Sequence, residues 1–193
     1  MPVTIYTSED AGAPPLLPNA AGSLIAVLDA CLVNGYGAKA GAGWSKPFSG
    51  VNLAAYKQGA GSNGMYCRID DSNGSTARVC GFENMTAVST GTAPFPTDAQ
   101  VSGGDYILKH NTGAGSRKWM VIASHKAFYF WTQFDTRTDG FYAGLTFFGD
   151  IKTRKPGDAF HTMLMAANGV TKNAEIPAGC NDHGGVMAPM NYF

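Results

Sequence analysis

The chain is poor in charged residues. Asp, Glu, Lys and Arg make up 15% of its 193 residues, and 14 basic residues balance 14 acidic ones, whereas soluble domains contain about 25% charged residues. A balanced charge provides no basic surface for nucleic acid or for an anionic membrane. Because free domains use net charge to stay soluble, this weakly charged chain, rich in Gly and Ala, is predicted to be covered by partners over much of its surface.

Long hydrophobic runs are absent as well. No apolar run approaches the roughly 18 residues that a membrane-spanning helix requires, so no membrane insertion is expected. The first residues, MPVTIYTSEDAGAPP, lack the basic and apolar regions of a secretion signal, which predicts synthesis and use in the cytoplasm, or exit by lysis or inside an assembly. The four cysteines, Cys31, Cys67, Cys80 and Cys180, are therefore expected to be reduced.

Motifs that carry catalysis are scarce. The glycine-rich stretch at 35–43 follows a predicted helix rather than a strand, so it cannot form a phosphate-binding loop. Ser124 and His125 are neighbours on a predicted strand and point to opposite faces, and no G-x-S-x-G elbow is present. Cys180 and His183 have the spacing of one zinc-ligand pair, but zinc sites usually have two close pairs. We expect no enzyme, no cofactor and no metal site.

What the chain does have is a dense apolar and aromatic stretch at 117–150. It predicts three consecutive antiparallel strands and the main part of the core. In the run Phe128, Tyr129, Phe130 and Trp131 both alternating sets are apolar or aromatic, unlike a strand with one solvated face. The sheet is therefore expected to be covered twice, once by the core and once by the helix or another subunit.

Two local features of the sequence make specific predictions. Apolar residues recur at intervals of three and four over 20–34, which indicates a helix that Asn19 or Ser23 would cap and that would end at Gly35. A hairpin is expected around residues 72–75. We favour the register that pairs Ile69 with Val79, Asp70 with Arg78 and Tyr66 with Phe82, because it keeps alternation and pairs opposite charges. As a consequence, Cys67 and Cys80 lie on opposite faces.

The predicted fold is mainly β, an antiparallel β-sandwich or open barrel of about eight to ten strands with one covering helix. Residues 20–167 form a single domain. Residues 1–19 and 168–193 are predicted to be extended terminal arms, the first of them either a frayed end or an arm docked on a neighbouring subunit. Residues 83–104 are read as a long loop of the kind that touches partners, with a short strand at Met85–Ser89 as an option within it. Interface candidates in these segments are Pro14, Pro15, Phe95, Pro96, Pro189, Tyr192 and Phe193.

Aromatic side chains also raise the alternative of glycan binding. Sugar rings stack on exposed aromatic residues, and Trp44, Trp119 and Trp131 are the candidates. A glycan-binding module predicts that at least one pair among these three is exposed. For the run at 128–131, a central strand buried on both sides is the preferred interpretation.

The segment SLIAVLDACLVNGYGAKAGAGW at 23–44 resembles a family of small virion proteins encoded by tailed bacteriophages and prophages. The similarity continues through KPFSG at 46–50, GTAPFPT at 91–97, and GFYAGLTFFGDI at 140–151 with the KPGDAF turn at 155–160. These motifs are structural, namely a helix with a glycine-rich exit, turns and aromatic strands, and they bring no catalytic residue. The resemblance implies a structural component of the particle.

On this resemblance, the expected function is that of a non-enzymatic virion component of the tail, baseplate or tail tip that acts through repeated subunit contacts. Its partners would be other virion proteins and symmetry copies of itself. One alternative is a capsid decoration or stabilising protein, and another is a host-glycan-binding module of the particle with a host surface glycan as its partner. The expected location is the virion, after synthesis in the host bacterial cytoplasm.

Overall fold

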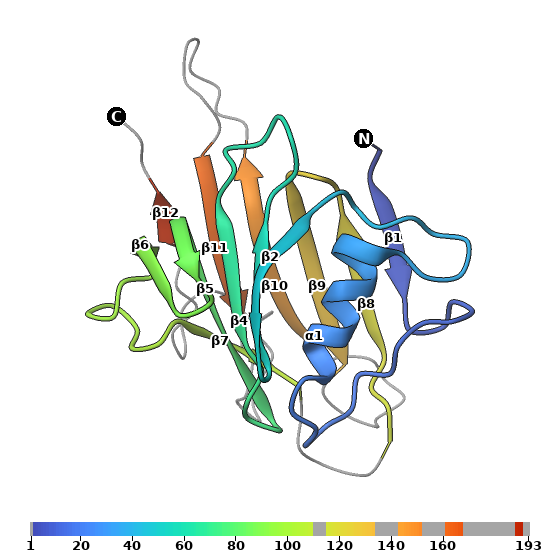
Figure 1. The fold of residues 1–193 in the computed structure, drawn as a ribbon. Coiled ribbons are helices and arrows are strands. Elements are labelled where there is room, and N and C mark those ends of the chain that lie inside the picture. Colours follow the sequence, from blue (N-terminus) through green and yellow to red (C-terminus); the bar gives the residue numbers. More distant parts are fainter. Residues whose placement is uncertain (1, 110–114, 134–142, 152–160, 168–187, 191–193) are drawn as a thin grey trace.

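The computed structural model describes residues 2–109, 115–133, 143–151, 161–167 and 188–190. It is mainly β, as the sequence predicts: two antiparallel sheets form a sandwich-like arrangement together with one short helix (Figure 1). The described part contains twelve strands, more than the eight to ten expected.

The first sheet, called the aromatic sheet below, has the strand order β1-β8-β9-β10-β11-β12. The three strands predicted within 117–150 are consecutive neighbours here, as β8, β9 and β10. Their inward side chains, Phe128, Phe130 and Phe148 among them, lie in the main core. The strands are β1 (Thr4–Thr7), β8 (Trp119–Ala123), β9 (Ala127–Gln133), β10 (Ala143–Ile151), β11 (His161–Ala167) and β12 (Ala188–Met190).

The second sheet has the order β2-β3-β4-β5-β6, and β7 pairs with the first part of β5. Pro47 lies on the edge strand β2, where its missing N–H costs no ladder hydrogen bond. The strands are β2 (Ser45–Gly50), β3 (Leu53–Lys57), β4 (Tyr66–Asp70), β5 (Thr76–Ala87), β6 (Thr90–Phe95) and β7 (Asp105–Leu108).

The β4–β5 hairpin has the register favoured from the sequence. Ile69 faces Val79, and the flanking pairs match as well. As a consequence Cys67 lies in the main core, whereas Cys80 belongs to a small cluster on the other face of the sheet. Both thiols are free.

The prediction of a long loop at 83–104 is wrong for its first half. Strand β5 continues to Ala87, and β6 returns along it from Thr90. The small residues, glycine and prolines of this segment suggest a loop, but an edge strand tolerates all of them because only one side of it needs a ladder partner.

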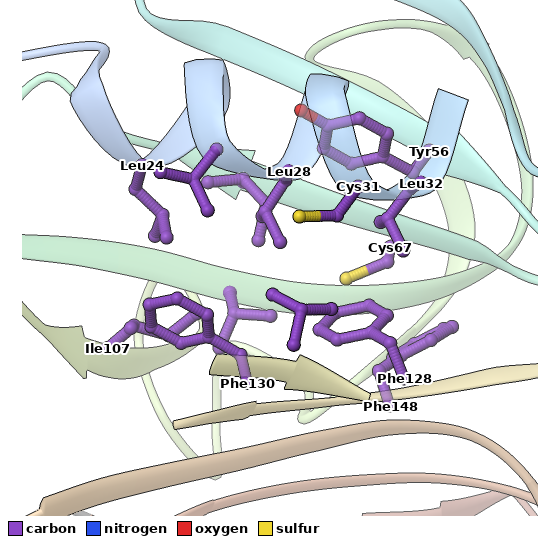
Figure 2. Packing of buried hydrophobic residues seen from close by; sticks show 14 of the residues in the cluster. Leu24, Leu28, Cys31, Leu32, Tyr56, Cys67, Ile107, Phe128, Phe130 and Phe148 are labelled. Atoms are coloured by element: carbon purple, nitrogen blue, oxygen red, sulfur yellow. The ribbon is translucent and has the colours of Figure 1, made fainter. Parts of the chain in front are cut away.

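The helix occupies the predicted segment but starts later than residue 20. It comprises α1 (Ser23–Leu28) and a π-helical continuation, η1 (Asp29–Asn34), and it ends at Gly35 as predicted, with φ at 78°. Figure 2 shows Leu24, Leu28 and Cys31 projecting from the helix toward the strands that carry Phe128 and Phe130. The helix therefore packs on the inner side of the aromatic sheet.

The predicted caps of the helix, Asn19 and Ser23, do not cap it. Instead, Asp71 from the end of β4 accepts hydrogen bonds from the backbone N–H of Leu24 (2.8 Å) and of Ile25 (3.4 Å). The Lys109 ammonium forms an ion pair with Asp71 and also donates to the Ala20 carbonyl (2.9 Å). Both side chains of this pair are fully buried. A residue distant in sequence thus supplies the cap, which no local pattern could reveal.

Residues 4–7 form strand β1 and residues 8–19 follow it through turns, and this N-terminal segment, predicted to be an extended arm, lies against the domain and contributes to its core. Strand β1 pairs with β8, with Tyr6 opposite Val121. The side chains of Tyr6 and Leu16 are fully buried in the main core. A carbonyl of this segment, that of Pro14, accepts the indole N–H of Trp119 at 3.0 Å. The domain boundary predicted at residue 20 therefore falls inside one packed unit.

The free edge of β1 is closed by a side-chain cluster. Asp10 accepts hydrogen bonds from the Thr7 N–H (2.7 Å) and the Tyr36 hydroxyl (2.8 Å), and Lys39 contacts it at 2.5 Å. Lys39 also donates to the Ile5 carbonyl at 2.8 Å. These bonds use backbone groups that an open strand edge would offer to other chains.

The Asp10 cluster makes stability depend on pH. The hydrogen bond and charge of Lys39 lower the pKa of Asp10 from 3.8 to about 2. A carboxylate with a lowered pKa stabilises the fold above its unfolded-state pKa, and that stability is lost as pH falls from 3.8 toward 2. Asp10→Asn is expected to cost about 1 kcal/mol at pH 7, after allowance for solvent screening, and to cost only a small part of this at pH 2, where the Asp10 carboxyl is about half protonated in the folded state.

Urea unfolding at pH 7 and at pH 2 measures this difference. Glu9→Gln is the matched control, because the Glu9–Lys118 pair is largely exposed, at 70% and 65% of the two side chains. The control should match the wild type at both pH values. An Asp10→Asn deficit of the same size at pH 2 would contradict the assignment of the effect to charge.

Candidate interaction surface

The pairing register aligns a row of apolar side chains across five strands of the aromatic sheet. Successive residues of a strand point to opposite faces, and the inward set of each strand lies in the core. The alternate set therefore points away from the second sheet. In register across the sheet, this row contains Ile5, Ile122, Tyr129, Phe147 and Met165.

A parallel row contains Met120 on β8, Trp131 on β9 and Leu145 on β10. Met163 on β11 lies beside the first row. We call this surface the outer face, and it consists of Ile5, Met120, Ile122, Tyr129, Trp131, Leu145, Phe147, Met163 and Met165.

The outer face is exposed in part and carries no charge. Of the nine residues, Tyr129 (45%) and Ile5 (53%) are exposed, six are half-buried, and Phe147 is buried at 5%. The Tyr129 ring packs on Phe147 with ring centres 4.6 Å apart. None of the nine positions holds Asp, Glu, Lys or Arg. Exposed apolar surface of this kind is a candidate for interaction with another molecule.

The second sheet has a different exterior. Three cationic side chains lie over aromatic rings: Lys57 over Tyr66 at 5.1 Å, Arg68 over Phe82 at 5.4 Å, and Arg78 over Tyr106 at 3.6 Å. Arg78 also donates to the Ser102 and Gly104 carbonyls, each at 2.9 Å. These contacts hold the 102–104 segment against the strands. They escaped sequence reasoning because each depends on cross-strand register.

Two of the three glycan-stacking candidates are buried. Trp44 is 4% exposed and packs edge-on against Phe128 and Phe148. Trp119 is 1% exposed. Each indole N–H has a backbone carbonyl as its acceptor, Ser124 for Trp44 and Pro14 for Trp119. The prediction of an exposed pair is wrong, because the N-terminal segment and the helix cover these rings. Trp131 is half-buried, on the outer face.

Two of the interface candidates, Phe95 and Pro96, are buried. The Phe95 ring stacks on Phe148 with ring centres 5.9 Å apart. Phe95 reaches the core because Gly81 opposite it has no side chain: a Cβ there would lie 2.2 Å from the ring. The prediction that these two residues contact a partner is therefore wrong.

The remaining candidates lie at the two ends of the chain. Pro14 is half-buried and Pro15 is exposed. Pro189 pairs with Met163 as part of β12. Tyr192 and Phe193 lie outside the described residues.

The described residues offer no candidate metal centre. No group of three or more His, Cys, Asp or Glu side chains is placed to hold a metal ion within these ranges. Cys180 and His183 lie outside them. Burial raises the pKa of the Cys80 thiol to about 11, and it raises that of Cys67 as well, so neither thiol forms the reactive thiolate at neutral pH.

Comparison with known proteins returned no family model, no curated protein and no solved structure that matches this chain. Among the helices that the structure describes, none has the length and apolar character needed to cross a membrane.

Proposed function

We propose that the chain is a non-enzymatic structural subunit of a tailed-bacteriophage particle that acts through repeated contacts with neighbouring subunits. The observation that supports this most directly is the uncharged outer face of the aromatic sheet. An assembly subunit needs a broad surface that is stable only when covered, and a regular sheet provides one with little loss of conformational freedom on binding.

Two further features agree with the proposal. The low charge of the whole chain suits a protein whose surface is covered in its working state. The resemblance of segments such as 23–44 and 140–151 to small phage virion proteins supports the class of assembly that we propose. Within that class we favour the tail, baseplate or tail tip, and a capsid decoration protein is the alternative.

A cryo-EM reconstruction of the particle encoded by the same phage or prophage tests the proposal. The expected result is density for repeated copies of this fold in the tail region, with the outer face in contact with protein. Density on the capsid shell would favour the decoration alternative. Purified particles without this chain, shown by mass spectrometry, would contradict the proposal.

Host-glycan binding has less support. Tyr129 and Trp131 both point outward from β9, which gives an aromatic platform. Glycan sites also need polar groups for the sugar hydroxyls, and Tyr129 and Trp131 offer the only polar side-chain atoms among the nine residues of the outer face. A glycan array in which Trp131→Ala abolishes binding would restore this alternative.

A further inference from the structure

Two basic side chains are buried among the described residues, and only one of them has a counter-ion. Lys109 is paired with Asp71. Arg117 is 6% exposed, and none of the ion pairs between described residues involves it. A guanidinium keeps its charge at neutral pH, and a buried charge without a partner is strongly destabilising. Arg117 therefore needs an anion that the described part of the chain does not supply.

The Arg117 atoms that lack a partner form one edge of the guanidinium. Nε and Nη2 are both buried, and neither has a hydrogen-bond partner among the described residues. The N–H bonds on this edge run parallel, which is the fork whose two hydrogen bonds the oxygens of a carboxylate or phosphate accept. The unused donors thus have the geometry that recognises an oxyanion.

A third donor without a partner lies beside this fork. The Thr132 hydroxyl is buried and has no hydrogen-bond partner within the described ranges. Thr132 is the cross-strand neighbour of Trp119, and Arg117 precedes Trp119 by two residues, so all three side chains share the inward face. Burial agrees, because Lys118 between them is exposed. Diagonal neighbours on one face are about 7–8 Å apart, within reach of a long side chain, so the fork and the hydroxyl can donate to one anion.

Backbone hydrogen bonds hold both strands at this position. The Arg117 N–H donates to the Leu16 carbonyl at 2.8 Å, and the Gln133 N–H donates to the Lys118 carbonyl at 3.0 Å. The first bond ties Arg117 to the N-terminal segment, and the second extends the ladder of β8 and β9 beyond Trp119. Donors on an ordered backbone bind a ligand with a smaller entropic cost than donors on a mobile one.

The charge of the site selects the class of ligand. One guanidinium balances one negative charge, which is the charge of a carboxylate. A phosphate group carries about −1.5 to −2 at neutral pH and would leave negative charge buried without a counter-ion, which is unfavourable. Two donors from the fork and one from the hydroxyl also suit the lone pairs of the two carboxylate oxygens.

We propose that Arg117 and Thr132 form a binding site for a carboxylate group of another molecule. The carboxylate belongs either to a small acid or to an acidic side chain of a neighbouring subunit. Only the second source rests on the proposed function, so the site and that function can fail separately.

Acetate is the probe for this site. Thermal unfolding of the full chain at pH 7 is measured in sodium acetate and in sodium chloride of the same ionic strength. At an acetate concentration about ten times its dissociation constant, the melting temperature should rise by about 3–6 °C. Arg117→Met should abolish this rise, and whatever difference remains in the variant measures the general effect of the salt. After that correction, sodium phosphate should give a smaller rise than acetate, and an equal rise would contradict the choice of a carboxylate.

Thr132→Val is the second variant, which keeps the shape of the side chain and removes only the hydroxyl. It should raise the dissociation constant of acetate about tenfold, the effect of one hydrogen bond to a charged group. Arg68→Met is the matched control, because Arg68 lies over Phe82 on the second sheet, and it should leave the acetate response unchanged. A wild-type chain that melts at the same temperature in both salts, or a full acetate response in Arg117→Met, would overturn the inference.

A short peptide distinguishes the two sources of the carboxylate. The peptide Gly-Glu-Gly, blocked at both ends, is titrated in the same assay, with Gly-Gln-Gly as its control. Binding of the glutamyl peptide at least as tight as that of acetate supports an acidic side chain of a neighbouring subunit. Binding of acetate alone supports a small acid as the ligand.

Discussion

Deletion of residues 1–15 is expected to leave no folded chain in solution. The deletion removes strand β1, so β8 becomes an edge strand and loses its ladder with residues 4–7. It also removes Tyr6, which is fully buried, and leaves the indole of Trp119 without its acceptor on Pro14. Loss of one large buried aromatic residue costs about 3–5 kcal/mol, and whole domains are stable by only about 5–15 kcal/mol.

Two point variants show whether the effect comes from the core. Tyr6→Ala should lower the free energy of unfolding by about 3–5 kcal/mol, measured by urea unfolding. Ile5→Ser changes the neighbouring residue, which points outward and is 53% exposed, and should cost less than about 1 kcal/mol. A truncated chain that stays soluble with a cooperative unfolding transition would show that the segment is a separable arm after all.

The sequence allowed some parts of this fold to be predicted because their causes are local. The helix over 23–34 follows from apolar spacing, and its end at Gly35 follows from backbone conformation. The register of β4 and β5 follows from alternation and the Asp70–Arg78 pair. Each of these depends on residues within one hairpin or one helix, where pattern and structure are directly linked.

The features that were missed depend on contacts between distant segments. The pairing of residues 4–7 with β8 has no local signal, because either end of a chain can be extended without belonging to a sheet. The burial of Trp44, Trp119 and Phe95 depends on which layer covers them. From the sequence, Trp44 and Trp119 were candidates for glycan stacking and Phe95 for an interface contact. The packing of the two sheets instead places all three side chains in the interior.

The outer face was anticipated in part. Apolar residues at both alternating positions of 128–131 predicted that the sheet is covered on two sides. The structure places the helix on the inner side, with Leu28 and Cys31 toward Phe128 and Phe130. From the sequence, two elements could cover the outward side of the sheet, the helix or another subunit. Because the helix lies on the inward side, another subunit is the one that remains.

The buried Asp71–Lys109 pair gives the second large effect. Asp71→Ala removes the counter-ion of a fully buried ammonium and the acceptor for the Leu24 and Ile25 amides. We expect a loss of about 3–5 kcal/mol, the usual cost of breaking a buried pair on one side. Burial raises the pKa of Asp71, while Lys109 and the two amides act against this rise. Lys109→Met should also destabilise, because it leaves the carboxylate buried without a cation.

The double variant Asp71→Asn with Lys109→Met separates the charge from the cap. Asp71→Asn keeps a side-chain oxygen that accepts from the helix amides, and Lys109→Met fills the volume of the lysine without a charge. Replacement of a buried pair by neutral residues of similar size is often nearly neutral, so a deficit of only about 1–2 kcal/mol is expected, measured by urea unfolding. Losses of the single variants Asp71→Asn and Lys109→Met that simply add in the double variant would show that the two side chains act independently. A strong positive coupling would show that the pair acts as a unit that fixes the start of the helix against the second sheet.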